Sequence, residues 1–101
     1  MDKIKKLMHS IDEELSDAMM YATRAETWHK DGCIEAAGLF AAMAKAELEH
    51  AANNERVMGM VAERHRDHAD KHMAIEMIRD VTRNRIEETK EEIHEILERI
   101  H

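Results

Sequence analysis

The sequence predicts an all-α fold: a long antiparallel helical hairpin followed by a third, C-terminal helix. The chain of 101 residues contains no proline, only three glycines and 3% aromatic residues. Good helix formers, chiefly Ala, Glu, Met, Lys, Leu, Ile and Arg, dominate it. A β-sandwich or barrel would need frequent turns and many β-branched or aromatic residues, which this composition does not supply. The length predicts a single domain that covers residues 1–101.

The boundaries of the three helices follow from local signals. Asp31-Gly32 is the clearest turn signal, so we expect the first helix at about residues 2–30 and the second from about residue 34. Gly59 is a weak stop, which predicts that the second helix ends near residue 58. A polar, histidine-rich stretch follows, in which Asp67 or Asp70 is available to cap a third helix at about residues 70–99.

Each of the first two helices has a seam, a row of residues at alternating three- and four-residue spacing that faces a partner helix. The first seam comprises Ile4, Leu7, Ile11, Glu14, Ala18, Tyr21, Ala25 and Trp28. The second comprises Ala36, Phe40, Met43, Glu47, His50, Asn54, Val57 and Val61. The third helix repeats Ile86, Ile93 and Ile100 every seven residues and bears no charge on that stripe, so we interpret it as packing.

Glu14, Glu47 and His50 are polar residues on seams where a core is expected, and they predict a metal site. A buried carboxylate costs several kcal/mol unless it is neutralised, and neither seam contains a lysine or arginine. Glu47 and His50 form a Glu-x-x-His step. Ferritin-like di-metal proteins take one Glu from each of two helices and Glu-x-x-His from each of two others. One chain offers half of that set, so dimerisation would complete the four-helix bundle. A metal-free polar network in the core is the alternative.

The same Glu-x-x-His spacing recurs in Glu91/His94 and Glu98/His101. Both pairs lie off the isoleucine stripe of the third helix, so we expect them on the solvated surface.

Charge and composition exclude several classes of partner. The net charge of −7 disfavours binding to nucleic acid. No run of 18 apolar residues is present, so no membrane-spanning segment is predicted. Cys33, the single cysteine, cannot form an internal disulfide or hold a metal alone. These features are typical of a cytoplasmic protein.

The combined spacing of several motifs resembles the first helical hairpin of rubrerythrins. These motifs are Glu14-x6-Tyr21, Lys30-Asp31-Gly32, Phe40 and Glu47-Leu48-Glu49-His50-Ala51. Glu13-Glu14-Leu15, Tyr21, Arg24 and Glu49-His50-Ala51 are equally similar to the encapsulated ferritins, short chains that build an iron site between two subunits. These 101 residues contain no second Glu-bearing hairpin and no cysteine-rich electron-transfer module. They also contain no targeting tail like that of encapsulated ferritins, so we expect either that the tail has been removed or that the protein works without a shell.

The resemblance implies roles for individual residues. Glu14 would be a terminal ligand, Glu47 a bridging carboxylate, His50 a terminal nitrogen ligand, and Tyr21 a hydrogen-bond donor near the metals, although ordinary core packing of Tyr21 is as good an interpretation. It implies two Fe ions per dimer, while the ligand set also suits Mn or Zn. The implied partners are a second copy, as a homodimer or a higher ring of dimers, and an encapsulin-type shell, which would place the protein inside a compartment.

The function that the resemblance implies is ferroxidase activity, in which Fe(II) is oxidised by O2 for storage or detoxification. One alternative is a rubrerythrin-like reduction of H2O2 with a separate electron donor. Another is a metal-free helical dimer that serves as an interaction module.

A last hypothesis concerns His65, His68 and His72, which would share one face if their segment were helical. With Asp67 and Asp70 nearby, they would concentrate metal ions at an entry point. The alternative is a solvated turn with incidental histidines.

Overall fold

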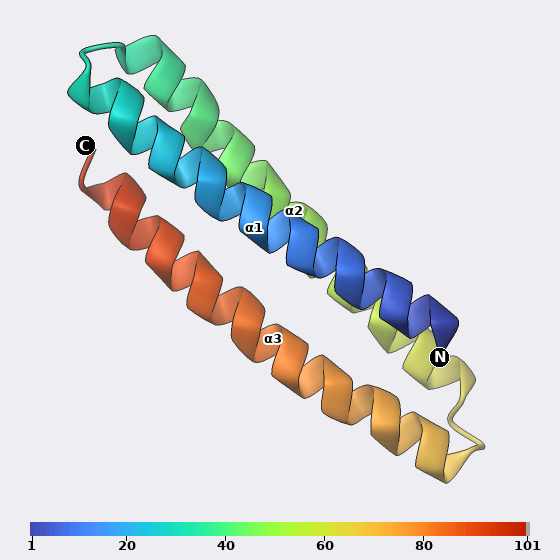
Figure 1. Ribbon diagram of the computed structural model, residues 1–101. Coiled ribbons are helices and arrows are strands. Elements are labelled where there is room, and N and C mark those ends of the chain that lie inside the picture. The colour runs from blue at the N-terminus through green and yellow to red at the C-terminus, as the bar shows by residue number, and fades with distance from the viewer. Residues whose placement is uncertain (101) are drawn as a thin grey trace.

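Three helices make up the computed structural model, which describes residues 1–100 (Figure 1). They are α1 (Asp2–Lys30), α2 (Ile34–Arg64) and α3 (Ala69–Glu98). α1 and α2 form an antiparallel hairpin, and α3 returns along it in the direction of α1. The predicted all-α fold is confirmed. Within the described residues, no helix has the length and apolar character needed to cross a membrane.

The turn between α1 and α2 depends on Gly32. Its φ of 84° lies in the left-handed region, which glycine enters without the clash of a Cβ. The chain then closes the C-terminus of α1 with two hydrogen bonds, from Gly32 N to His29 O at 3.0 Å and from Cys33 N to Trp28 O at 2.9 Å. The predicted boundary at Asp31-Gly32 is therefore confirmed.

The predicted end of α2 at Gly59 is wrong, because the helix continues to Arg64. A Cβ at Gly59 would lie 2.8 Å from Cζ of Arg79, so the glycine gives space to an arginine of α3 rather than ending the helix. The N-cap of α3 is His68, without a side-chain hydrogen bond. The expectation that Asp67 or Asp70 caps this helix is therefore also wrong.

The core lies where all three helices meet. Its largest fully buried side chains are Ile4, Ile11, Met58, Ile75 and Ile93. Alanines with 0–2% exposure line the contact between α1 and α2, which lets the two backbones approach closely. On the predicted isoleucine stripe of α3, Ile86 and Ile93 are buried and Ile100 is partly buried.

The predicted seam of α1 lies partly in this core, whereas the predicted seam of α2 lies at its edge. In α1 every second member is buried, namely Ile4, Ile11, Ala18 and Ala25. In α2 none of the eight predicted seam residues is fully buried. The buried residues of α2 are instead Ala37, Ala44, Leu48, Ala51, Glu55, Met58 and Ala62. The reason is that α3 packs on one side of the hairpin, so the residues of α2 that face both α1 and α3 are the buried ones.

Ion pairs tie α3 to that side of the hairpin. Arg85 pairs with Asp12 and Arg99 with Glu26 on α1, while Arg79 pairs with Glu55 on α2. The hydrogen bond from Arg99 lowers the pKa of the Glu26 carboxyl. The other side of the hairpin, which α3 does not cover, we call the open face. We assign to it seam residues that are not fully buried, namely Glu14, Tyr21, Trp28, Phe40, Met43, Glu47, His50, Asn54 and Val57.

Candidate metal centre

The three predicted ligands all lie on the open face. Glu14 comes from α1, and Glu47 and His50 come from successive turns of α2. Glu14 and Glu47 are partly buried, and the side chain of Glu47 is 20% exposed. The His50 side chain is 56% exposed. The carboxylates therefore sit at the edge of the packed hairpin, while the imidazole projects from it.

Glu47 and His50 contact each other directly. Nδ1 of His50 lies 3.0 Å from Oε1 of Glu47. With its proton on Nδ1, a neutral His50 donates to this carboxylate, and Nε2 keeps a free lone pair. Imidazole nitrogen and carboxylate oxygen are ligands that suit Fe, Mn and Zn.

Glu14 is held from the neighbouring helix by Asn54. Nδ2 of Asn54 donates to Oε1 of Glu14 at 2.8 Å, in a partly buried position. The sequence placed Asn54 on the seam of α2 but gave it no function. It follows Glu47 by seven residues and His50 by four, so the three side chains lie along one side of α2.

These side chains have the chemistry of metal ligands, but they do not complete a metal site within one chain. Within residues 1–100, no three His, Cys, Asp or Glu side chains come close enough to hold a metal ion on their own. Over the same residues, no lysine or arginine forms an ion pair with Glu14 or Glu47. Two partly buried carboxylates without a counter-charge, beside an imidazole, match the donor chemistry of a divalent cation.

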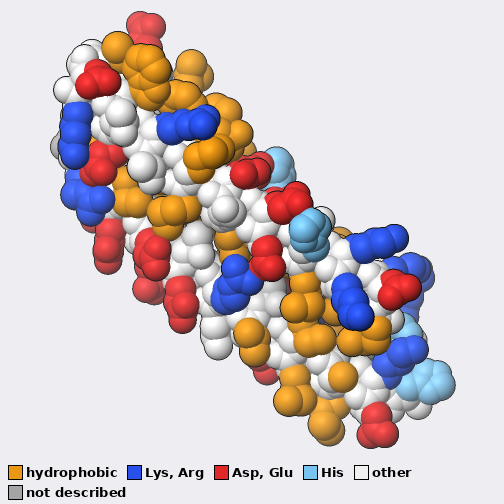
Figure 2. All heavy atoms as spheres, in the orientation of Figure 1, with side chains coloured by type: hydrophobic (Ala, Val, Ile, Leu, Met, Phe, Trp, Pro, Cys, Tyr) orange, Lys and Arg blue, Asp and Glu red, His pale blue; other side chains and the backbone are white. Residues whose placement is uncertain are grey.

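Aromatic rings extend the open face toward the α1–α2 turn. Phe40 stacks between Tyr21 and Trp28, with centroid distances of 6.3 and 6.4 Å. The interaction that the structure assigns to Tyr21 is this stacking. Trp28 and Met43 are each 41% exposed, and Val57 is 39% exposed. Figure 2 shows hydrophobic side chains gathered toward each end of one side of the molecule, with charged residues between them.

The segment of His65, His68 and His72 does not form one helix, so the condition for a shared helical face is not met. α2 ends at Arg64, His65 and His68 lie in the turn, and His72 lies in α3. His65 and His72 instead bind the carbonyls that end α2: Nδ1 of His65 lies 2.9 Å from Val61 O, and Nδ1 of His72 lies 2.8 Å from Ala62 O. The His65 and His68 rings are 6.4 Å apart.

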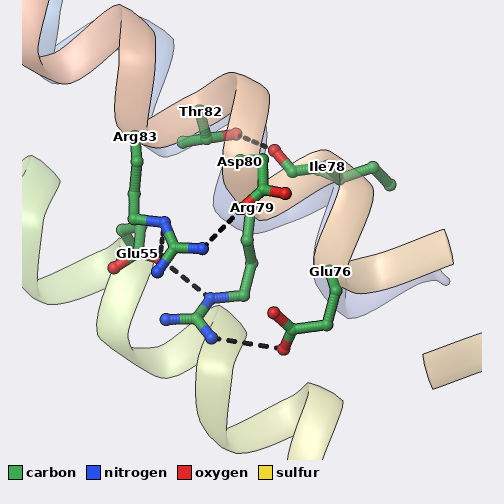
Figure 3. Close-up of polar contacts among 7 residues, drawn as sticks. All are labelled: Glu55, Glu76, Ile78, Arg79, Asp80, Thr82 and Arg83. Atoms are coloured by element: carbon green, nitrogen blue, oxygen red, sulfur yellow. Dashed lines mark hydrogen bonds and ion pairs between the residues drawn. The ribbon is translucent and has the colours of Figure 1, made fainter. Parts of the chain in front are cut away.

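An ionic cluster around the buried carboxylate of Glu55, between α2 and α3, was not predicted from the sequence (Figure 3). Glu55, 7% exposed, accepts a hydrogen bond from Nε of Arg79 at 2.8 Å and lies 3.7 Å from Nε of Arg83. Arg79 also donates to Glu76 at 3.2 Å, and Arg83 to Asp80 at 2.6 Å.

Burial lowers the pKa of the Arg79 guanidinium, but the hydrogen bonds and charges of Glu55 and Glu76 outweigh this and raise it overall. Arginine satisfies both carboxylates, which makes this a structural cluster rather than a metal site. A signal for it was present in the sequence. Arg79 continues the spacing of Ile75, Thr82 and Ile86, which are all buried on the core side of α3.

The second Glu-x-x-His pair lies where it was expected. Glu91 and His94 are both exposed on α3, and so is Glu98. Its partner His101 lies outside the described residues.

Comparison with known proteins gives one family match. The family model described as rubrerythrin matches residues 5–72, which is more than half of the chain and includes most of α1 and all of α2. No curated protein matches the chain, and no solved structure does.

Proposed function

The chain belongs to the rubrerythrin family, and from this we propose that it is a di-iron protein that oxidises Fe(II) at a site shared by two subunits. Rubrerythrin-family domains generally bind two iron ions, which supports iron as the metal. In the proposed site, each subunit supplies Glu14, Glu47 and His50.

The observation that carries the proposal is an incomplete donor set on an uncovered face. Glu14, Glu47 and His50 share the open face, yet no three donors among residues 1–100 suffice for a metal ion. The same face leaves Trp28, Met43 and Val57 about two-fifths exposed. A second copy related by a two-fold axis would cover these side chains and add the missing donors, and two-fold dimers are the commonest symmetric assembly.

Charge supports two divalent cations per dimer. Two copies bring together four carboxylates, Glu14 and Glu47 from each, whose four negative charges balance two divalent ions. The site can then be enclosed without net charge, which removes the cost of burying unpaired carboxylates. Mn or Zn fits the same donors, since affinity for such ligands does not by itself select iron.

In the proposed reaction, Fe(II) is the substrate and O2 the oxidant. Each of two Fe(II) ions gives one electron, and O2 takes up two electrons and two protons to become H2O2. The chain contributes carboxylates that bind the substrate ions and stabilise the increased charge of Fe(III). A second copy that covers the open face would limit the access of water to these carboxylates.

Oxygen and peroxide consumption test the reaction. We expect Fe(II)-dependent uptake of O2 in stoichiometric proportion to the Fe(III) formed, measured with an oxygen electrode and by absorbance. Faster Fe(II) oxidation by H2O2 than by O2 would instead make the protein a peroxide reductase that needs a separate electron donor. Protein that is purified without chelator and contains no metal would support a metal-free interaction module.

The same assay at limiting Fe(II) tests an entry role for His65, His68 and His72. We propose that the free Nε2 atoms of His65 and His72, together with His68, collect Fe(II) near the end of α2. A triple alanine variant should then oxidise limiting Fe(II) more slowly but reach the wild-type rate at saturating Fe(II). Equal rates at both concentrations would leave these histidines with a capping role, and the loss of those caps should cost about 1 kcal/mol of stability.

The outward surface of α3 supports assembly beyond a dimer. Met73, Met77 and Val81 recur every fourth residue and are 62–64% exposed. We assign this surface to contacts between dimers in a higher ring. We also propose that the protein can be enclosed in an encapsulin-type shell in the cytoplasm, where Fe(III) would be stored. Enclosure would require a targeting segment.

A further inference from the structure

We propose that Asn54 is a positioning residue that holds the Glu14 carboxylate ready for metal, an inference that rests on the proposed function. Glu14 is the only proposed ligand on α1, whereas Glu47 and His50 share α2. The hydrogen bond from Nδ2 of Asn54 to Oε1 of Glu14, at 2.8 Å, fixes the α1 ligand to the helix that carries the other two.

The residue type at position 54 suits this task. An amide donates a hydrogen bond without carrying charge, so Glu14 keeps the negative charge that a cation needs. An arginine or lysine would neutralise the carboxylate and compete with the metal, and an aspartate would repel it. Because Asn54 binds Oε1, the second oxygen of Glu14 remains free as a metal ligand.

The position of Asn54 explains why it acts on Glu14 rather than on the core. The residue is partly buried on the open face, and its neighbour Glu55 points to the other side of α2, toward Arg79. Asn54 therefore follows Glu47 and His50 along one side of the helix and meets Glu14 across the α1–α2 contact. Groups that orient a metal ligand in this way typically change metal affinity about 10- to 100-fold when they are removed.

Titration with Zn²⁺, which is redox-inert, tests the role without the oxidation reaction. The Asn54→Leu substitution keeps the branched shape and the number of heavy atoms but removes the donor, and we expect it to weaken Zn²⁺ binding about 10- to 100-fold. Its melting temperature without metal should stay within a few degrees of the wild type. The Asn54→Gln variant retains the amide and should recover part of the lost affinity.

Asn53 provides the matched control. It precedes Asn54 in α2, is exposed, and accepts a hydrogen bond from Arg56 rather than contacting Glu14. Asn53→Leu should bind Zn²⁺ as the wild type does. Equal Zn²⁺ affinity in wild type and Asn54→Leu, or equal losses in both variants, would overturn the positioning role. Wild-type protein that binds no Zn²⁺ would overturn the proposed function and this role together.

A metal-free measurement checks the hydrogen bond itself. In ¹⁵N-labelled protein, the side-chain amide signals of Asn54 should shift in the Glu14→Ala variant, while those of Asn53 should not. Unchanged Asn54 signals would contradict the contact even if the wild type binds metal.

Discussion

Replacing Glu47 by alanine is expected to abolish di-metal binding. In a symmetric dimer the substitution removes two of four carboxylates, including the residue to which the family resemblance gives the bridging role. The remaining Glu14 and His50 of each copy cannot balance two divalent charges. His50→Ala should weaken binding severely, and Glu14→Ala should weaken it as well. The measurement is metal content by elemental analysis after loading with Fe(II) under anaerobic conditions.

The chain contains its own control for this prediction. Glu91 and His94 repeat the Glu-x-x-His spacing but are exposed on α3, away from the open face. Glu91→Ala and His94→Ala should therefore leave metal content unchanged. Equal metal loss in Glu91→Ala and Glu47→Ala would contradict the assignment of the metal site to Glu47 and His50 alone.

Replacing Arg79 by methionine should destabilise the fold by about 3 kcal/mol, because it leaves the buried carboxylate of Glu55 without its nearest cation. Exposed Arg83, 3.7 Å from Glu55, offsets only part of this loss. A second substitution, Glu55→Leu, should restore much of the stability, since it removes the unpaired buried charge. Urea denaturation at a fixed protomer concentration measures both effects, because a dimer's stability depends on concentration.

Substitutions at an exposed ion pair and at two glycines are the controls for the stability effect of Arg79→Met. Arg99→Met breaks the exposed pair with Glu26 and should destabilise the fold far less than Arg79→Met does. Gly38→Ala meets no atom within 4 Å and should stabilise α2 by about 1 kcal/mol. Gly59→Ala should lose that gain, because the new Cβ would collide with the Arg79 guanidinium. Equal costs for Arg79→Met and Arg99→Met would show that the buried cluster does not hold α3 in place.

Local signals predicted most of the fold. The break at Asp31-Gly32 lies where the sequence placed it, because a single glycine at positive φ determines it. The end of α2 could not be found in the same way. Gly59 has the local appearance of a helix stop, but its structural reason is Arg79, twenty positions later in another helix. Only the packed structure reveals such a non-local cause.

The candidate site shows a similar division. Periodicity predicted Glu14, Glu47 and His50 on one side of the hairpin. In the structure Glu47 contacts His50, and Glu14 accepts a hydrogen bond from Asn54, one turn beyond His50. It did not indicate that α3 would cover the opposite side, so Glu55 was missed and the buried face of α2 was misplaced by about one residue. A third helix can pack on either side of a hairpin of two amphipathic helices. The side on which it packs determines which residues of the hairpin are buried.

Native mass spectrometry of protein that has been loaded with Fe(II) or Zn²⁺ tests the shared site most directly. We predict that metal is found only on dimers or on assemblies of dimers, with two ions for every two chains, and that monomers carry none. A monomer that retains two metal ions would contradict a site built from two half-sets of Glu14, Glu47 and His50.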